Sequence, residues 1–432
     1  MKVIAYPPQN RWASLIKRPT ESFASIEASV KNILELVKTK GDKSLIELTK
    51  KFDNVVVRDL QIDKKTIVAA GKNIPSSLKR AIDTAYKNIY TFHIAQISKT
   101  EKIETAPGVI CWRKSIGIEK AGLYIPGGSA PLFSTVLMLG IPAQIAGCKE
   151  VILCTPPGKN GDVNPAILYA ANKCGIKKIY RVGGAQAIAA MAFGTKTIPK
   201  VDKIFGPGNS FVMIAKQLVS LTGVAIDMPA GPSEVLIIAD DSAHAGFVAA
   251  DLLSQAEHGP DSQVILVSTS KKLIESVNKE LIAQLKLLPR KGIAEKALVN
   301  SSAILVKNLD EAIGFSNLYA PEHLILSCIG AEKISEKVIN AGSVFIGNYS
   351  PESAGDYASG TNHTLPTNGY ARAYSGVSVD SFVKKVTFQE LSPEGLLKLG
   401  STIEVMAVAE QLYAHKNAVT MRINEIKRKK NV

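Results

Sequence analysis

The sequence predicts an α/β protein with parallel sheets, and three observations support this fold class. Short apolar runs typical of buried strands alternate with helix-like segments through the middle of the chain. Glycine turns follow several of these runs and open the next helix. The 432 residues are 46% hydrophobic, an ordinary globular composition that suffices for two to four domains.

The N-terminal part of the chain is predicted to be an arm followed by helices. Prolines 7, 8 and 19 surround a short apolar piece, so residues 1–20 are expected to form an arm that needs another surface, such as a partner subunit. Apolar residues at helical spacing then predict helices over 20–40 and 42–52, and a longer one from Pro75.

From Gly108 onward the pattern changes to short β-rich runs over 108–112 and 117–125, where a hinge or domain boundary fits. Strands and helices then alternate, which predicts two α/β layers. The predicted strands are 151–154, 179–182, 201–205, 235–238, 264–267, 303–306 and 344–346. The predicted helices between them are 165–173, 185–193, 211–221, one that ends at His258, and 272–287.

Two later segments differ from this alternation. Residues 347–376 lack periodicity and are rich in Gly, Ser, Thr and Asn, and a loop of that length inside a compact protein is usually functional. Residues 392–430 are helical in pattern but too short for a core of their own.

The net charge of +14 raises nucleic-acid binding as an alternative class of function. The lysines are scattered singly, however, and the only dense run is 427–430. Aromatic residues at 6% offer few stacking surfaces. A generally basic, solubilising surface is therefore favoured, and no nucleic-acid partner is expected.

Membrane association and disulfide bonding are not expected either. No stretch approaches the roughly 20 apolar residues of a membrane span, and the N-terminus has no charged head followed by an apolar core. The five cysteines lack CxxC spacing and are expected to be reduced thiols. These features favour a cytoplasmic protein.

The histidines divide into two groups and indicate where metal chemistry is possible. His258, His323, His363 and His415 lie in polar or Gly/Pro-punctuated surroundings, whereas the other two lie on amphipathic helices. Gln255 and His258 are three residues apart, which places both on one face of a helix. With Asp356 and His415 they would give the mixed N/O set that suits zinc, although a polar helix C-terminus is the simpler interpretation of Gln255 and His258 alone.

Glu322 and His323 place a carboxylate beside an imidazole, the two groups most often used for proton transfer near neutral pH. Either can act as a general base. The alternative is a solvent-exposed Glu-His pair after a proline.

Glycine turns at 127–128, 183–184 and 206–208 each follow a strand-like run, where backbone N–H groups can meet the phosphates of a nucleotide. The third turn lacks the last glycine of a dinucleotide fingerprint and no acidic residue about twenty positions on is clearly placed, so ordinary tight turns remain an alternative. Cys111 and Cys148 are candidate nucleophiles for aldehyde oxidation, but structural thiols fit them better.

Eight blocks, in order and over nearly the whole chain, closely resemble the histidinol dehydrogenase family. They are 122–128 (GLYIPGG), 181–187 (RVGGAQA), 205–209 (FGPGN), 226–234 (IDMPAGPSE), 254–261 (SQAEHGPD), 320–324 (APEHL), 360–367 (GTNHTLPT) and 409–418 (AEQLYAHKNA). The resemblance implies oxidation of L-histidinol to L-histidine by two hydride transfers to NAD through bound histidinal, the last step of histidine biosynthesis.

The resemblance also implies an architecture. Two incomplete Rossmann-like domains are expected, with small terminal elements exchanged in a homodimer. The implied boundaries are an arm over 1–20, a first domain over 21–124 with 233–377, an inserted second domain over 125–232, and a small helical C-terminal domain over 378–432.

Residue roles follow from the same resemblance. One zinc per subunit is expected on Gln255, His258, Asp356 and His415 of the partner, where it orients the substrate. His323 is expected to accept the alcohol proton and Glu322 to activate the water that hydrates histidinal. The remaining contacts are Ser233, Glu410 and His363 to the substrate, beside the metal ligands and His323, and Tyr124, Gln186 and Asn209 to NAD.

Two alternatives remain open at this point. One is a thiol-dependent aldehyde dehydrogenase that uses Cys111 or Cys148. The other is a metal-dependent regulatory protein that kept the scaffold without catalysis.

Overall fold

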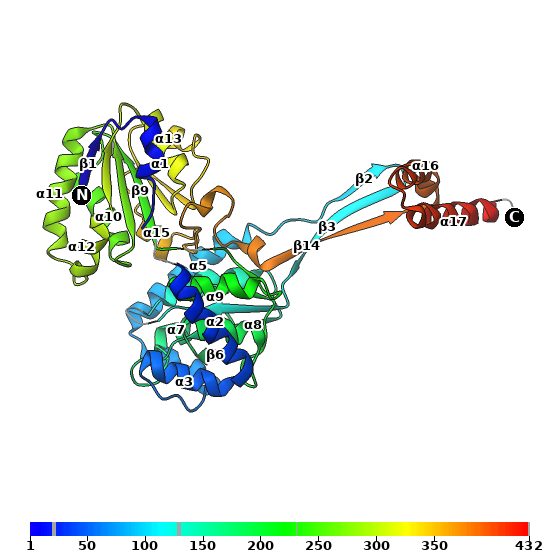
Figure 1. Ribbon diagram of the computed structural model, residues 1–432, viewed down its shortest axis with the longest axis horizontal. Helices are drawn as coiled ribbons and strands as arrows, with labels where there is room; N and C mark the ends of the chain where they lie inside the picture. The colour runs from blue at the N-terminus through cyan, green and yellow to red at the C-terminus, as the bar shows by residue number, and fades with distance from the viewer. Residues whose placement is uncertain (20–22, 128–130, 230, 431–432) are drawn as a thin grey trace. The chain divides into compact units, whose positions relative to one another are not determined.

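The computed structural model describes residues 1–19, 23–127, 131–229 and 231–430, and these form two compact units (Figure 1). The first unit comprises residues 1–96 and 118–382, and the second comprises 97–117 and 383–432. Thr20, at the end of the predicted arm, and Gly128, in the first glycine turn, lie outside the described residues. In the part of the chain that is described, no helix is long and apolar enough to span a membrane.

One sheet of the first unit has six parallel strands in the order β1-β11-β10-β9-β12-β13. Their bounds are β1 (Lys2–Ala5), β9 (Glu234–Ala239), β10 (Gln263–Ser268), β11 (Ser302–Leu305), β12 (His323–Ser327) and β13 (Ser343–Ile346). The predicted strands within it lie within two residues of these bounds. The parallel α/β fold class is therefore confirmed.

Both faces of this sheet are covered by helices, because successive side chains of a strand point to opposite sides (Figure 1). Val235 and Ile237 of β9 pack with α10 (Ala245–Ala256), α11 (Lys271–Leu285) and α12 (Lys291–Val299). Leu236 and Ile238 pack on the other side with Trp12, α13 (Leu309–Tyr319) and α14 (Ala331–Ser335). The sheet thus has a separate apolar core on each face, and β9 contributes side chains to both.

The N-terminal arm docks on its own chain. Strand β1 pairs in parallel with β11, and the following helix α1 (Gln9–Leu15) buries Trp12. The indole ring of Trp12 meets Phe315 edge to face with 5.6 Å between ring centroids. The surface that the arm was expected to need is therefore provided by β11 and α13.

The second sheet of the first unit has five parallel strands in the order β6-β5-β4-β7-β8. Its strands are β4 (Lys120–Tyr124), β5 (Glu150–Thr155), β6 (Lys178–Arg181), β7 (Lys203–Phe205) and β8 (Ala225–Ile226). From β4 the chain builds outward on one side and then returns at β7 to build on the other. The carboxyl ends of β4 and β7 therefore form a topological switch point, where open α/β sheets bind their ligands.

Helices from two parts of the chain cover this sheet. On one face lie α2 (Phe23–Lys40), α3 (Asp42–Asp53), α8 (Gly184–Phe193) and α9 (Ser210–Ser220), and on the other α4 (Lys64–Ala69), α5 (Ser76–Ile94), α6 (Phe133–Ile145) and α7 (Pro165–Lys173). The predicted domain boundaries place residues 21–124 in one domain with residues 233–377, which form most of the six-stranded sheet. In the structure, the helices α2 to α5 of this segment pack on the five-stranded sheet instead. Helical periodicity identifies the apolar face of α2 or α5, but not the sheet against which it packs.

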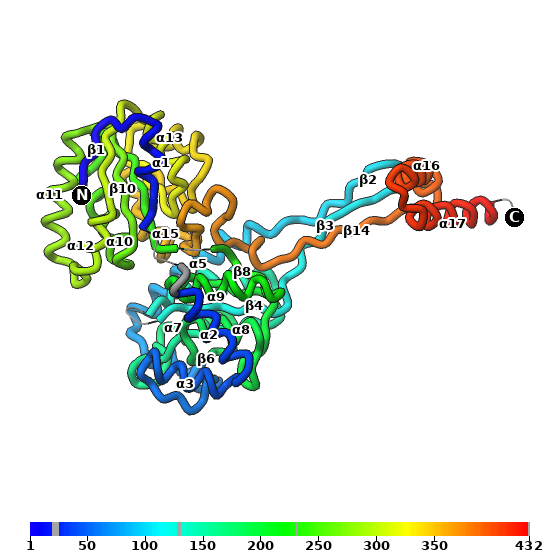
Figure 2. The backbone as a smooth tube through the Cα atoms, viewed as in Figure 1, coloured from blue at the N-terminus to red at the C-terminus, as the bar shows by residue number. Residues whose placement is uncertain are grey.

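The second unit is an antiparallel sheet with two helices (Figure 2). Strands β2 (Lys102–Ala106), β3 (Val109–Gly117) and β14 (Val383–Leu391) run side by side in the order β14-β3-β2, and α16 (Pro393–Ala409) packs against α17 (Tyr413–Lys430). The predicted helical pattern over 392–430 is confirmed. The long irregular segment before it contains a short α-helix, α15 (Glu352–Tyr357), and one 3-10 turn, η2 (Tyr370–Arg372).

Candidate active site

Glu322 and His323 stand at the beginning of β12, between β9 and β13. Only 6% and 3% of their surfaces are exposed, so the alternative of a solvent-exposed pair is wrong. The pair is buried because β12 lies between two strands that are distant in the sequence, so its first residues are inside the sheet. A carboxylate and an imidazole removed from water in this way are costly unless they have partners.

The partners come first from the backbone of Glu234, which begins β9. Its N–H donates to Oε2 of Glu322 at 2.9 Å, and its carbonyl lies 3.3 Å from Nδ1 of His323. Since a carbonyl only accepts, Nδ1 is the donor in this contact. Nε2 lies 3.4 Å from Oδ1 of Asp356. His323 is thus oriented with Nε2 toward the Asp356 carboxylate.

The carboxylates around His323 dominate its protonation. Burial alone would lower the pKa of His323, but the negative charge of Glu322 and its contact with Asp356 outweigh burial and raise the pKa well above the ordinary value. Burial would raise the pKa of Asp356, but the histidines around it, His323 first, lower it. The pair is a coupled acid and base of the kind used in proton transfer.

Gln255 lies in the last turn of α10 and is 1% exposed. Its Nε2 is 3.3 Å from Nδ1 of His323, and its Oε1 has no hydrogen-bond partner among the described residues. The helix ends at Ala256, two residues earlier than predicted, and a turn follows in which the N–H of His258 donates to the carbonyl of Gln255 at 3.2 Å. His258 is exposed, and its charge acts on Asp356.

His363 connects the irregular segment to helix α6. Nδ1 of His363 donates to the carbonyl of Asp356 at 2.8 Å, and Nε2 accepts from the hydroxyl of Thr135 at 3.0 Å. Burial lowers the pKa of His363, which keeps the ring neutral. Sequence reasoning missed Thr135, because nothing in the sequence connects two residues 228 positions apart.

Glu352 is a second residue that sequence reasoning missed. It opens α15, four positions before Asp356, and is 1% exposed. Its Oε1 accepts from the hydroxyl of Ser254 at 2.5 Å, and burial raises its pKa to about 8. Little in the sequence indicates that Glu352 is buried near the predicted ligands. The one possible signal is its partner Ser254, because that residue directly precedes Gln255.

The residues predicted to hold zinc fit a metal in their chemistry. Gln255 offers a buried amide oxygen that nothing else uses, and Asp356 a carboxylate whose lowered pKa keeps it charged. Within residues 1–19, 23–127, 131–229 and 231–430, no group of three or more His, Cys, Asp or Glu side chains is arranged to hold a metal. Gln255, His258 and Asp356 supply only two ligands of those types, so a further histidine would have to complete the set.

The three predicted NAD contacts lie at the carboxyl edge of the five-stranded sheet. Tyr124 ends β4, and its hydroxyl accepts from the N–H of Gly184 at 3.0 Å, at the start of α8, which carries buried Gln186. Asn209 follows β7 and caps α9, since its side chain accepts from the N–H of Val212 at 3.2 Å. At the turn after β7 the backbone lies close to β4. A side chain at Gly206 would therefore meet the carbonyl of Tyr124. Closely packed glycine turns at a switch point suit a dinucleotide.

The other predicted residues lie in different places. Ser233 precedes β9 and is partly exposed beside Glu234. Glu410 and His415 are exposed residues of the second unit, at the end of α16 and in the first turn of α17. The structure brings Gln255, Asp356 and His323 together within the first unit.

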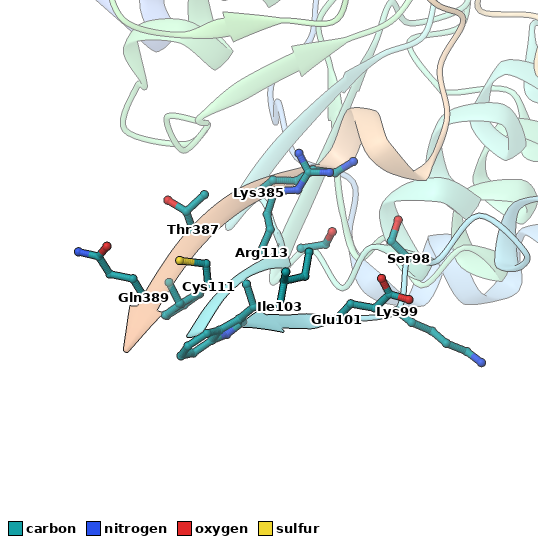
Figure 3. Close-up of a pocket in the computed structure, with 12 residues that line it drawn as sticks. Ser98, Lys99, Glu101, Ile103, Cys111, Arg113, Lys385, Thr387 and Gln389 are labelled. Atoms are coloured by element: carbon teal, nitrogen blue, oxygen red, sulfur yellow. The ribbon is translucent and has the colours of Figure 1, made fainter. Parts of the chain in front are cut away.

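The second unit carries a hollow of about 800 Å³ over strands β2, β3 and β14 (Figure 3). Its lining includes Cys111, Arg113 and Lys385, all labelled in the figure, and none of the residues predicted to bind the metal, the substrate or NAD. Cys148, the other candidate thiol, donates to the carbonyl of Phe382 at 3.7 Å, and burial raises its pKa to about 11. A thiol with a raised pKa is a poor nucleophile at neutral pH.

Comparison with known proteins identifies the family of this chain. Residues 16–423 match the model of the family described as Histidinol dehydrogenase. A histidinol dehydrogenase of Bacteroides thetaiotaomicron is 58% identical over 99% of this chain and 100% of its own length. One of Mannheimia succiniciproducens is 54% identical over 95% of this chain and 96% of its own.

A solved structure agrees with these relatives. The crystal structure of histidinol dehydrogenase from Elizabethkingia anophelis is 55% identical, covers 99% of both chains and superposes with a TM-score of 0.96. Family match, sequence identity and fold therefore coincide over almost the whole chain. The chain belongs to the histidinol dehydrogenase family and is an oxidoreductase.

Proposed function

We propose that the protein oxidises L-histidinol to L-histidine with two molecules of NAD, through bound L-histidinal, as the last step of histidine biosynthesis. The names of its relatives support the substrate. The observation that carries the proposal is the buried pair Glu322 and His323, set against Asp356 and against an amide oxygen of Gln255 without a partner.

We infer that one zinc ion per subunit is held by Gln255, His258, Asp356 and His415 of the partner subunit. When bound, zinc would supply a Lewis-acidic anchor that orients the substrate and would neutralise the Asp356 carboxylate. With that carboxylate neutralised, one cause of the raised pKa of His323 is removed. The pKa of His323 would then be lower than in the metal-free protein, although the charge of Glu322 still raises it, and the neutral ring can act as a base.

The first oxidation converts the alcohol to the aldehyde. His323 accepts the hydroxyl proton at Nε2 while the hydride of the carbinol carbon passes to the nicotinamide. The carbonyl of Glu234 holds the ring of His323 by its other nitrogen, so the accepting atom stays directed at the site. One NADH and one proton leave for each alcohol oxidised.

The second oxidation needs a water molecule. Glu322 takes a proton from water as the oxygen adds to the aldehyde carbon, which gives the anion of the hydrate. This anion then loses its hydride to a second nicotinamide and becomes the carboxylic acid, so no further proton has to be removed. The N–H of Glu234 fixes the Glu322 carboxylate for this task. Ser233, His363 and Glu410 of the partner subunit are proposed to hold the substrate, and Tyr124, Gln186 and Asn209 to contact NAD at the switch point.

A homodimer is proposed because the second unit exposes apolar side chains that a single chain leaves uncovered. They gather around the end of α16 and the start of α17, where 70% of Val405, 60% of Met406 and 63% of Tyr413 are exposed. Glu410 and His415 lie among them in the sequence. A partner that covers this segment would receive both residues.

The test is NADH absorbance after the zinc-loaded protein is mixed with L-histidinol and NAD. Two NADH per histidinol are expected if both oxidations occur. No NADH would refute the dehydrogenase and favour a regulatory protein on the same scaffold. Supplying L-histidinal directly should give one NADH and separates the second oxidation from the first.

A further inference from the structure

The glycine turn after β7 is held by a buried ion pair. Lys216, on α9, donates from Nζ to the carbonyl of Gly206 at 2.9 Å. Asp227, just after β8, accepts from the N–H of Gly206 at 2.8 Å through Oδ2, and its Oδ1 pairs with Lys216. The backbone N–H and the backbone carbonyl of Gly206 are thus bound by side chains of opposite charge.

This arrangement is unusual for an ordinary turn. The side chains of Lys216 and Asp227 are 4% and 1% exposed, and removing two charges from water is unfavourable before their attraction is counted. Apart from each other, their hydrogen bonds go to Gly206 and to the N–H of Met228 at 2.7 Å. The pair therefore acts mainly on the conformation of the turn.

That conformation is one that only glycine adopts freely. Gly206 has a φ of +129°, and a side chain there would meet the carbonyl of Tyr124. The turn runs from the carboxyl end of β7 to Asn209, beside the carboxyl end of β4. It is therefore one wall of the topological switch point.

Asp227 lies 21 positions after Gly206, a spacing at which a dinucleotide-binding unit often presents an acidic residue to the ribose. Here its two oxygens are occupied by Gly206, Lys216 and the N–H of Met228. The carboxylate of Asp227 thus supports the backbone of the glycine turn, and it does not have a free oxygen for a ribose hydroxyl.

We propose that Lys216 and Asp227 are positioning residues for NAD, which fix the turn 206–208 so that the dinucleotide can approach its backbone. This inference rests on the proposed function, since it names NAD as the molecule at the switch point. It predicts that the pair governs the affinity for NAD without affecting the histidinol site at Glu322 and His323.

The experiment uses the zinc-loaded, full-length protein and titrates NADH by its fluorescence. Lys216→Met leaves Asp227 buried without its cationic partner and removes the donor to the carbonyl of Gly206, so it is expected to weaken NADH binding about tenfold or more through a displaced turn. The KM for histidinol should stay within about twofold of the parent, whereas the KM for NAD should rise with the dissociation constant. Lys178→Met is the matched control, because Lys178 forms an exposed ion pair with Glu150 at 2.6 Å on the same sheet.

The double variant Lys216→Met with Asp227→Leu separates positioning from stability. Replacing both charges by apolar groups restores the thermal midpoint toward the parent, but it cannot restore the two hydrogen bonds to Gly206. Weak NADH binding in a stable double variant supports the proposal. Parental NADH affinity in that variant, or equal changes in both KM values, overturns it, while absence of turnover in the parent would count against the proposed function instead.

Discussion

The guanidinium of Arg18 and the carboxylate of Glu234 form a buried ion pair with 2.5 Å between Nε and Oε2. Arg18 also donates to the carbonyl of Tyr319 at 2.8 Å, and its guanidinium lies 3.9 Å from the centre of that ring. Glu234 in turn holds Glu322 and His323 through its backbone. The end of the N-terminal arm therefore anchors the strand on which both proton-transfer residues depend.

Removing Arg18 should destabilise the protein strongly. Arg18→Met leaves the Glu234 carboxylate buried without its cationic partner, and the free energy of unfolding is expected to fall by about 3–5 kcal/mol, as urea titration would measure. Adding Glu234→Gln removes the uncompensated charge and should recover much of the loss. A loss in Arg18→Met no larger than that of the exposed pair variant Lys337→Met would contradict this account.

Glu322→Gln should separate the two oxidations. The amide can still accept from the N–H of Glu234, so the geometry is retained, but it cannot take a proton from water. The second step is expected to slow by about 10²–10⁴-fold, so that the NADH yield falls toward one per histidinol and histidinal accumulates. An unchanged yield of two would assign the water activation to another residue.

The cysteines should be dispensable. At pH 8 a thiol with a pKa of about 11 is about one part in a thousand thiolate, so alkylation of Cys148 should be slow and rise about tenfold per pH unit. Replacing Cys111 and Cys148 by Ala is expected to leave turnover within about twofold. Loss of the aldehyde step in that variant would revive the thiol-dependent mechanism.

Glu352 should make the metal-free protein less stable as the pH rises. Its pKa in the folded state is about 8, above the unfolded value, so the stabilisation is complete below the unfolded pKa and is lost as pH rises toward 8. The slope from this group is at most about 1.4 kcal/mol per pH unit. Glu352→Gln, which still accepts from Ser254, should flatten the stability curve between pH 5 and 8.

This prediction has a simple check. Urea unfolding of parent and variant in a chelator at pH 5 and at pH 8 gives the two slopes directly. Equal slopes would mean that Glu352 is ionised in the folded protein throughout this range.

Mixed dimers test whether the metal site is shared between subunits. A dimer of one His258→Ala chain and one His415→Ala chain keeps one intact set of ligands, so random reassociation should restore about a quarter of the parental activity. Each variant alone should be inactive. If mixing restores nothing, the four ligands belong to one chain.

The fold class could be predicted from the sequence because strands buried on both faces are continuous apolar runs, as in 264–267. Periodicity also located α7 to the residue. Which face of which sheet a helix covers could not be predicted. Helices α2 and α5 have the same apolar periodicity in sequence, yet they cover opposite faces of the five-stranded sheet. The register of a strand and the identity of its neighbours depend on contacts between residues far apart in the sequence, which local patterns do not record.

The site shows the same division. The blocks that resemble the family supplied the predicted ligands and bases by position. The burial of Glu322 and His323 could not be derived locally, because it results from pairing of β12 with β9 and β13. Arg18, 216 positions from Glu234, and Lys216 under a glycine turn carry no signal in their own surroundings.

The pairing of β3 with β14 sets a condition on protein synthesis. Gly117 pairs with Val383, so a ribosome must add roughly 270 further residues after β3 emerges, which takes on the order of ten seconds or more. Throughout that time the nascent chain exposes an unpaired strand edge, the kind of surface that recruits other chains. Translation stalled before β14 is therefore expected to yield aggregates, and chaperones would protect this hairpin.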